Sequence, residues 1–276
     1  MSKKNNSILT SYLKEIKMKQ IIQNKLKEIE QEYDIKILFA LESGSRAWGF
    51  PSMDSDFDVR FIYVRKLEDY LRINSKNEFL DFPINDELDI NGWDLRKFLK
   101  HLYASNATPF EWMQSPTFYT KQEEYYNSIL QLLPDFFCQQ TVVHHYLGLV
   151  KKQILQLNSE QIKLKTFFYV IRSLLSAKYC LKMNHYSPMQ IDKLLFLVED
   201  DSLRAEIIDL IEIKGKGVES DFIQLSTVLF LYLHDLYREI STASKTKRKG
   251  AFNEDLLESN YLKLVTNAND RFFKTT

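Results

Sequence analysis

The sequence is poor in the residues that build disulfide frameworks and tight turns. Of its 276 residues two are cysteines, Cys138 and Cys180, and they form no C-x-x-C pair. This excludes a disulfide scaffold and a cysteine zinc site, and we expect both thiols to be small buried apolar groups in a reducing compartment. Seven glycines and six prolines are few for this length, which argues against a β-sandwich with many tight turns and favours long helices.

The sequence also lacks net charge and long apolar runs. Lysine and arginine (37) balance aspartate and glutamate (37), which excludes a wholly basic surface but not a local basic patch. No segment reaches the roughly 18 apolar residues of a membrane span, and lysine and glutamate interrupt the N-terminal segment, unlike a secretory signal. We therefore expect a cytoplasmic protein without membrane contact. With 45% hydrophobic and 13% aromatic residues, a real core is available and a disordered chain is excluded.

The hydrophobic pattern changes at about residue 120. Before it, the spacing predicts a long amphipathic helix over 8–33, strands over 35–41, 57–64 and 88–91, and a short helix over 66–73. After it, helical periodicity dominates, with helices expected over 121–133, 139–157, 162–183, 188–199, 202–213, 221–240 and 251–264.

These elements predict an α+β fold with two domains. Residues 1–120 would form a small mixed β-sheet with flanking helices, and residues 121–276 an all-helical domain. No linker rich in proline, glycine or serine separates them, so we expect the two parts to pack tightly, with the active site in the cleft between them.

Residues with phosphate- and metal-binding chemistry follow the first predicted strand. Gly44 and Ser45 come directly after it, where a glycine allows close approach to the backbone and a helix start offers free N–H groups to an anion. Asp56 and Asp58 begin the next strand, and their two-residue spacing places both on one face. Asp89 lies between two apolar residues on the third predicted strand.

Three such carboxylates suit a site for divalent cations. Like charges at short range repel unless a positive charge lies between them, and Mg²⁺ prefers oxygen ligands. Three carboxylates can hold two ions, one for the nucleophile and one for the leaving group. A lone G-S pair or a lone D-x-D is usually a turn or a solvated edge. The order of strand, G-S, ten residues, D-x-D and a later apolar-flanked aspartate is far more specific.

This pattern resembles the DNA polymerase beta-type nucleotidyltransferase superfamily. Within it, five segments are similar to the RNA-repair-pathway, polymerase-beta-like nucleotidyltransferases: ESGSRAWGF, SDFDVRFIY, INGWDLRKFL, EWMQSP and YVIRSLL. The resemblance extends over residues 40–200 and is densest over 42–119.

The resemblance implies a mechanism and a set of residues. Gly44 and Ser45 would hold the β- and γ-phosphates of a nucleoside triphosphate. Asp56 and Asp58 would ligate two Mg²⁺ ions, with Mn²⁺ as an alternative, and Asp89 would ligate the ion that activates the incoming hydroxyl. The hydroxyl attacks the α-phosphorus and pyrophosphate leaves, so the protein contributes mainly positioning and charge neutralisation.

Further nucleotide-binding residues are expected around this motif. Arg46 could neutralise phosphate charge or be an exposed arginine. Lys165, Tyr169 and Arg172 recur at steps of four and three, on one helix face. Their similarity to the K-x-x-x-Y-x-x-R helix of the family implies contact with the triphosphate and the sugar or base, whereas a solvent-exposed stripe is the alternative.

For other residues a structural role competes with a functional one. Trp48 and Phe50 could frame a base, but packing is favoured. Asp54 is interpreted as a turn residue, and Asp94 as a helix N-cap. Weaker candidates are Asp86 and Glu87 in place of Asp89, Arg96 near the cleft, Lys214 and Lys216, and the basic run over 245–249.

The expected function is transfer of a nucleoside monophosphate from a triphosphate to an acceptor hydroxyl. An RNA end is the favoured acceptor, as in RNA repair or end modification. Two alternatives stay open: a protein adenylyltransferase of the toxin–antitoxin type, and a catalytically idle nucleotide- or RNA-binding module. The intact motif argues against the idle module.

Overall fold

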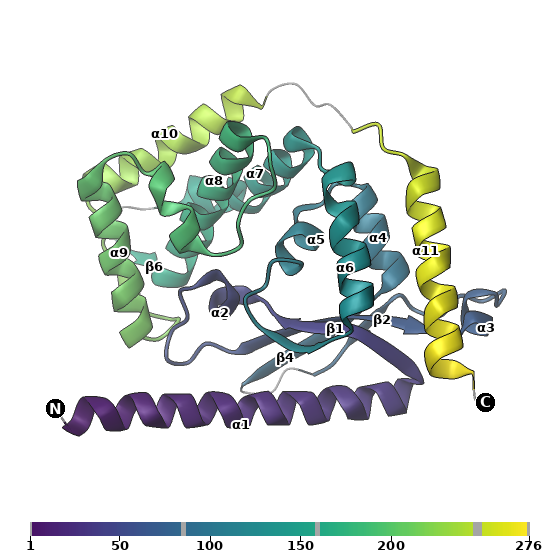
Figure 1. Cartoon of the computed structure of the whole chain (residues 1–276). Helices are drawn as coiled ribbons and strands as arrows, with labels where there is room; N and C mark the ends of the chain where they lie inside the picture. Colours follow the sequence, from purple (N-terminus) through teal and green to yellow (C-terminus); the bar gives the residue numbers. More distant parts are fainter. Residues whose placement is uncertain (1, 84–86, 158–160, 245–249, 275–276) are drawn as a thin grey trace.

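A five-stranded mixed sheet forms the centre of the sheet-bearing half of the protein. The computed structural model describes residues 2–83, 87–157, 161–244 and 250–274 (Figure 1). The sheet order is β3-β4-β2-β1-β5. The strands are β1 (Ile35–Glu42), β2 (Phe57–Arg65), β3 (Phe79–Asp81), β4 (Leu88–Asp94) and β5 (Phe118–Lys121). β2 and β4 are parallel, and the other neighbouring pairs are antiparallel.

Helices surround the sheet and extend beyond it. They are α1 (Ser2–Tyr33), α2 (Gly44–Trp48), α3 (Leu67–Tyr70), α4 (Leu95–Tyr103), α5 (Ala107–Trp112), α6 (Glu123–Leu132), α7 (Gln139–Gln156), α8 (Leu164–Met183), α9 (Asp201–Lys216), α10 (Thr227–Ala243) and α11 (Glu254–Ala268). Two short strands, β6 (Ile162–Lys163) and β7 (Phe222–Ile223), pair next to α8. Short 3₁₀ turns occupy Leu133–Phe136, Ile191–Lys193 and Leu195–Leu197, and a π turn follows α11 at Asn269–Phe273.

The two faces of the sheet belong to two hydrophobic clusters. α1 lies along one face (Figure 1), where Ile22 and Ile29 pack with Val59 and Phe61 of β2. The alternate residues of β2, such as Ile62, belong to the second cluster, which continues through α4 to α8 and on to α10. Because strand side chains alternate between faces, Asp58 and Arg60 lie on the same face as Ile62, the one covered by the helices.

The predicted α+β fold is confirmed, and one core cluster joins the sheet to the later helices. The boundary at residue 120 stays a prediction. Cys180 is buried as expected, while Cys138 is half-buried. No helix in the described part of the chain is long and apolar enough to cross a membrane.

Three details of the predicted secondary structure were wrong. The helix expected over 188–199 contains instead two 3₁₀ turns, because its buried apolar residues do not keep a helical spacing: Ile191, Leu194, Leu197 and Val198 are buried, whereas Phe196 is exposed. α10 begins at Thr227, not 221, because the Ser226 side chain caps it by accepting from Leu229 N. The edge strands β3 and β5 were not predicted. The run 245–249 and Asp86 lie outside the described residues.

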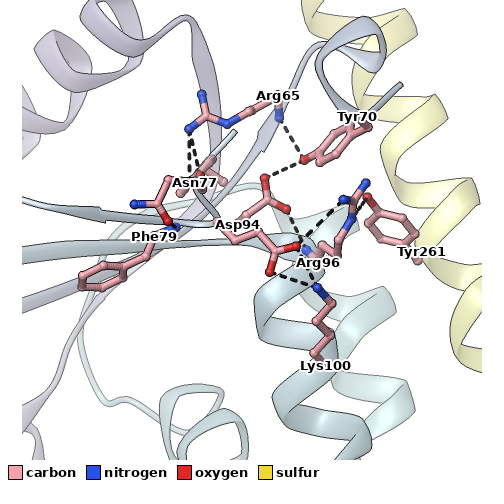
Figure 2. A network of polar contacts seen from close by, with 10 residues as sticks. Arg65, Tyr70, Asn77, Phe79, Asp94, Arg96, Lys100 and Tyr261 are labelled. Atoms are coloured by element: carbon pink, nitrogen blue, oxygen red, sulfur yellow. Dashed lines mark hydrogen bonds and ion pairs between the residues drawn. The ribbon is translucent and has the colours of Figure 1, made fainter. Parts of the chain in front are cut away.

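A buried polar network ties the last long helix to the sheet (Figure 2). It lies where β2 and β4 end. Tyr70 Oη donates to Asp94 Oδ2 over 2.9 Å, and Arg96 N donates to Asp94 Oδ1 over 2.8 Å, so the predicted N-cap of α4 is confirmed. Arg96 Nε in turn donates to Tyr261 Oη of α11 over 3.1 Å. These bonds fix α11 against α4 at the sheet end opposite the candidate site.

Candidate active site

The turn between β1 and α2 is shaped by a carboxylate. Gly44 has φ +59°, and a Cβ atom there would lie 1.7 Å from Asp58 Oδ2, so only glycine fits. Ser43 N also donates to Asp58 O over 2.8 Å. The glycine therefore allows the Asp58 side chain to lie directly against the start of α2, which joins the G-S and D-x-D motifs into one site.

Hydroxyl groups gather beside this turn. Ser45 Oγ donates to Ser55 Oγ over 3.0 Å, and Ser52 Oγ lies 2.8 Å from Ser55 Oγ. All three serines are buried. Sequence reasoning identified Ser45 but missed Ser52 and Ser55, which lie on the loop that leads into the D-x-D motif.

Arg46 is directed at the backbone. Its Nε donates to the carbonyl oxygens of Ser55 and Asp56 over 3.3 and 3.2 Å, and its guanidinium lies 3.8 Å from the Phe57 ring centroid. The side chain is 18% exposed. It therefore holds the start of the D-x-D motif in place and is not the exposed arginine of the alternative interpretation.

The register of the two parallel strands places Asp58 opposite Asp89. Both accept from the same atom: Arg60 Nη2 lies 2.9 Å from Asp58 Oδ1 and 2.6 Å from Asp89 Oδ2. Arg60 Nη1 donates to Asp89 O over 2.9 Å. Sequence reasoning missed Arg60, although its two-residue step from Asp58 places it on the same strand face.

Negative charge is concentrated around these carboxylates. Burial raises the pKa of Asp58, as do the charges of Asp89 and Asp56, while Arg60 opposes the rise. The pKa of Asp56 is raised by burial and then by Glu219 and Asp89. A site with so many close carboxylates attracts cations.

A buried glutamate supports Asp58 from behind. Glu42 Oε1 accepts from Asp58 N over 2.8 Å, and the Tyr119 hydroxyl donates to Glu42 Oε2. Burial raises the pKa of Glu42 to about 7. Glu42 ends β1 and was not singled out in the sequence, because a glutamate at a strand end carries no local signal of burial.

The donor set fits Mg²⁺ in its chemistry. The carboxylate oxygens of Asp58 and Asp89 lie within reach of one positive atom, Arg60 Nη2. Among the described residues, no group of three or more histidine, cysteine, aspartate or glutamate side chains is arranged to hold a metal ion. The Arg60 guanidinium lies between the two carboxylates, where their like charges favour a cation. Asp56, expected at the start of the strand, lies instead in the loop one residue before β2, which begins at Phe57.

Two of the three residues predicted on α8 face this charge. Lys165 and Tyr169 both interact electrostatically with Asp58, and Lys165 Nζ lies 2.5 Å from Glu219 Oε2. Arg172 is 3% exposed and lies one turn further. It pairs with Glu111 at 2.9 Å and lies 4.4 Å from the Trp48 ring centroid.

A pocket of about 410 Å³ adjoins the turn on the α8 side. It is lined among others by Ser43, Trp48, Glu111, Tyr169 and Arg172. Tyr169 and Arg172 therefore line one cavity beside the turn at Gly44. Lys165 lies on the same face of α8, closer to the carboxylates.

The remaining candidates have structural contacts. Phe50 stacks on Phe168 with ring centroids 4.8 Å apart, in agreement with packing. Asp54 Oδ1 accepts from Glu219 N over 3.0 Å on an exposed turn. Glu87 is exposed and lies 3.0 Å from Lys14, and Arg96 belongs to the network at the far end of the sheet.

Three comparisons relate this chain to known proteins. A model of the RNA repair pathway DNA polymerase beta family matches residues 18–261. An uncharacterized protein of Bacillus subtilis (strain 168), YcgL, is 38% identical over 230 residues, 83% of this chain and 88% of that protein. The crystal structure of a nucleotidyltransferase-like protein from Exiguobacterium sibiricum 255-15 is 11% identical and covers 90% of this chain and 89% of its own, with a TM-score of 0.32.

The family match includes the turn at Gly44, the D-x-D motif and Asp89, and it extends through α8 and α9. The resemblance inferred from the sequence is confirmed. The chain belongs to the RNA repair pathway DNA polymerase beta family.

Proposed function

We propose that this protein transfers a nucleoside monophosphate from a nucleoside triphosphate to an acceptor hydroxyl with the help of Mg²⁺. The observation that carries the proposal is the register of β2 and β4, which brings Asp58 and Asp89 together directly beside the Gly44–Ser45 turn. In the reaction, the acceptor oxygen bonds to the α-phosphorus and its proton is released to solvent, while the bond from the α-phosphorus to the α,β-bridging oxygen breaks and pyrophosphate leaves with that oxygen.

Asp56, Asp58 and Asp89 are the residues that would hold the cations. Bound Mg²⁺ supplies charge neutralisation on the phosphates and lowers the pKa of the attacking hydroxyl. The backbone at Gly44 and the Ser45 hydroxyl would donate to the phosphate chain. Lys165 adds positive charge from α8, where the leaving pyrophosphate gathers negative charge.

Residues behind the carboxylates hold their positions. Arg46 binds the carbonyl oxygens before the D-x-D motif, and Glu42 binds the amide of Asp58. Rate enhancement in phosphoryl transfer comes mainly from positioning and electrostatics. Such a site therefore needs the residues at the start of β2 to be held in fixed positions. The pocket lined by Trp48 and Tyr169 offers aromatic surface for the base or sugar.

An RNA end is the acceptor that we propose. The description of the family names an RNA repair pathway, and the predicted basic run 245–249 favours a polyanion. We also propose a cytoplasmic location, which the two cysteines without a C-x-x-C pair favour.

Label transfer tests the acceptor. Each α-labelled nucleoside triphosphate is offered with Mg²⁺ to the purified protein, alone and with total RNA. We expect label on RNA. Label on the protein or on an added protein fraction would instead support the protein adenylyltransferase, and no transfer with any triphosphate would support the idle binding module.

A further inference from the structure

The loop after α9 places a carboxylate among phosphate-binding groups. We propose that Lys165, Lys214 and the hydroxyls of Ser52 and Ser55 form a subsite for the terminal phosphates of a polyphosphate chain. The Glu219 carboxylate is an internal anion that occupies this subsite. The identity of the ligand as the tail of a nucleoside triphosphate rests on the proposed function, whereas the anion subsite itself does not.

The first support is a buried lysine that lacks an ion pair within the described residues. Lys214, in the last turn of α9, is 1% exposed, and its Nζ donates to Ser52 Oγ over 3.3 Å. No carboxylate within the described residues forms an ion pair with it. A buried ammonium group is costly unless an anion and further hydrogen bonds compensate it. Burial accordingly lowers the pKa of Lys214. An anionic ligand would supply the missing charge.

The second support is the position of Glu219. Its Oε2 lies 2.5 Å from Lys165 Nζ, and its Oε1 accepts from Ser55 Oγ over 3.4 Å. The carboxylate thus lies between a lysine and a hydroxyl cluster, both of which are donors suited to phosphate oxygens. Lys214 also interacts electrostatically with Glu219.

The third support is the attachment of the loop. Glu219 N donates to Asp54 Oδ1 over 3.0 Å, and Met53 N donates to the carbonyl of Gly217 over 3.1 Å. These bonds connect the loop to the segment between the G-S and D-x-D motifs. Glu219 is therefore held next to the segment that leads into the D-x-D motif.

At this position the Glu219 carboxylate uses the two donors that a phosphate would need, Lys165 Nζ and Ser55 Oγ. It also adds negative charge next to Asp54, whose side chain accepts from Glu219 N. A phosphate group that entered would replace the Glu219 side chain on Lys165 and Ser55 and would also compensate Lys214. The Glu219 carboxylate therefore competes with the phosphate for these donors, and this competition lowers the affinity of the subsite for the ligand.

Calorimetric titration with inorganic tripolyphosphate tests the subsite without any transfer reaction. The full-length chain is titrated in EDTA and in Mg²⁺, together with the variants Glu219→Gln, Lys214→Met and Lys216→Gln. Lys216 is the matched control, because it lies two residues from Lys214 on α9, is exposed and pairs with Glu212 at 3.4 Å.

We expect Glu219→Gln to bind tripolyphosphate about tenfold more tightly and Lys214→Met about tenfold more weakly than the unmodified chain, which is the usual size for one charged contact. Lys216→Gln should stay within about twofold. A purely structural role of Glu219 predicts a lower melting temperature and unchanged or weaker binding for Glu219→Gln. That result in both buffers would overturn the proposal, even if Lys214→Met failed to fold.

The two proposals fail separately. If label transfer is absent but this order of affinities holds, the anion subsite stands and the proposed reaction does not. If transfer proceeds and the order of affinities is absent, the reaction stands and the subsite is refuted.

Discussion

Arg60 balances the charge of the candidate site. One of its nitrogen atoms contacts both Asp58 and Asp89, and the arginine side chain is 14% exposed. Without it, two partly buried carboxylates would face each other across adjacent strands. An arginine suits this position because its planar fork can donate in several directions at once.

Arg60→Gln should therefore destabilise the metal-free protein by on the order of 2–4 kcal/mol, below the roughly 3–5 kcal/mol for breaking a fully buried ion pair, because the side chains of Asp58 and Asp89 are 26% and 21% exposed. Mg²⁺ should recover more stability in the variant than in the unmodified chain, because the freed carboxylates gain a cation. Urea unfolding in EDTA and in Mg²⁺ measures both effects. Arg238→Gln, which breaks an exposed pair with Asp235, is the control. Equal Mg²⁺ gains in Arg60→Gln and the unmodified chain would contradict a cation site between Asp58 and Asp89.

Gly44 has no room for a side chain, because its added Cβ would meet Asp58 Oδ2. We expect Gly44→Ala to lower the unfolding free energy by about 2 kcal/mol or more, through the clash and the positive φ. Gly148, in the interior of α7, has nothing within 4 Å of an added Cβ. Gly148→Ala should instead stabilise by about 0.5–1 kcal/mol. Equal effects of the two substitutions would refute the close contact between the two motifs.

At the scale of elements, the regular parts of the fold were predictable and the irregular ones were not. β1 and β2 were visible as apolar or alternating runs, and α4 through its cap at Asp94. β3 and β5 have three and four residues, too few to establish a period of two. They form strands because β3 pairs with β4 and β5 pairs with β1 at the edges of the sheet.

The candidate site was predictable where its residues are close in sequence. Gly44, Ser45, Asp56 and Asp58 lie within one short stretch, so spacing alone groups them. Glu219 reaches Lys165 and Ser55 from a loop 164 positions beyond Ser55, and no local pattern indicates that contact. The hydrogen bonds of the loop after α9 to Met53 and Asp54 hold it there.

The network that holds α11 should make stability depend on pH. Burial raises the pKa of Asp94 to about 6, against the opposing effects of the Arg96 and Tyr70 hydrogen bonds and the Arg65 charge. The folded chain therefore binds more protons than the unfolded chain between about pH 4 and 6. The free energy of unfolding should fall as pH rises through this range and level off above pH 6.

Asp94→Asn should remove this dependence, worth on the order of 2–3 kcal/mol between pH 4 and 7. The asparagine oxygen can still accept from Arg96 N, so the cap of α4 is retained. Urea unfolding of both proteins at several pH values measures the difference. The pKa of Glu42 is also raised, but Glu42 is present in both the unmodified protein and Asp94→Asn. Its contribution to the pH dependence is therefore the same in both proteins. Identical pH slopes would show that Asp94 is not the titrating group.

At the scale of the whole molecule, the site depends on segments that are far apart in sequence. The turn and the D-x-D motif come from β1 and β2, Asp89 from β4, and the lysines from α8 and α9. One hydrophobic cluster runs from the helical face of the sheet into α8 and α10, and Phe50 beside the turn stacks directly on Phe168 of α8. This shared core positions the helical lysines relative to the strand carboxylates.

The central claim is that Asp58 and Asp89 form the catalytic centre of a nucleotidyl transfer reaction. Label transfer from α-labelled triphosphate, compared among the unmodified chain, Asp58→Asn, Asp89→Asn and the exposed β3 variant Asp81→Asn, tests it most directly. Arg60 keeps one carboxylate partner in each active-site variant, so both should stay folded. We predict that each loses at least about a hundredfold in rate, more than the usual loss for a residue that only supports metal ligands, while Asp81→Asn transfers normally. Folded Asp58→Asn and Asp89→Asn proteins that transfer label at the rate of the unmodified chain would contradict the account.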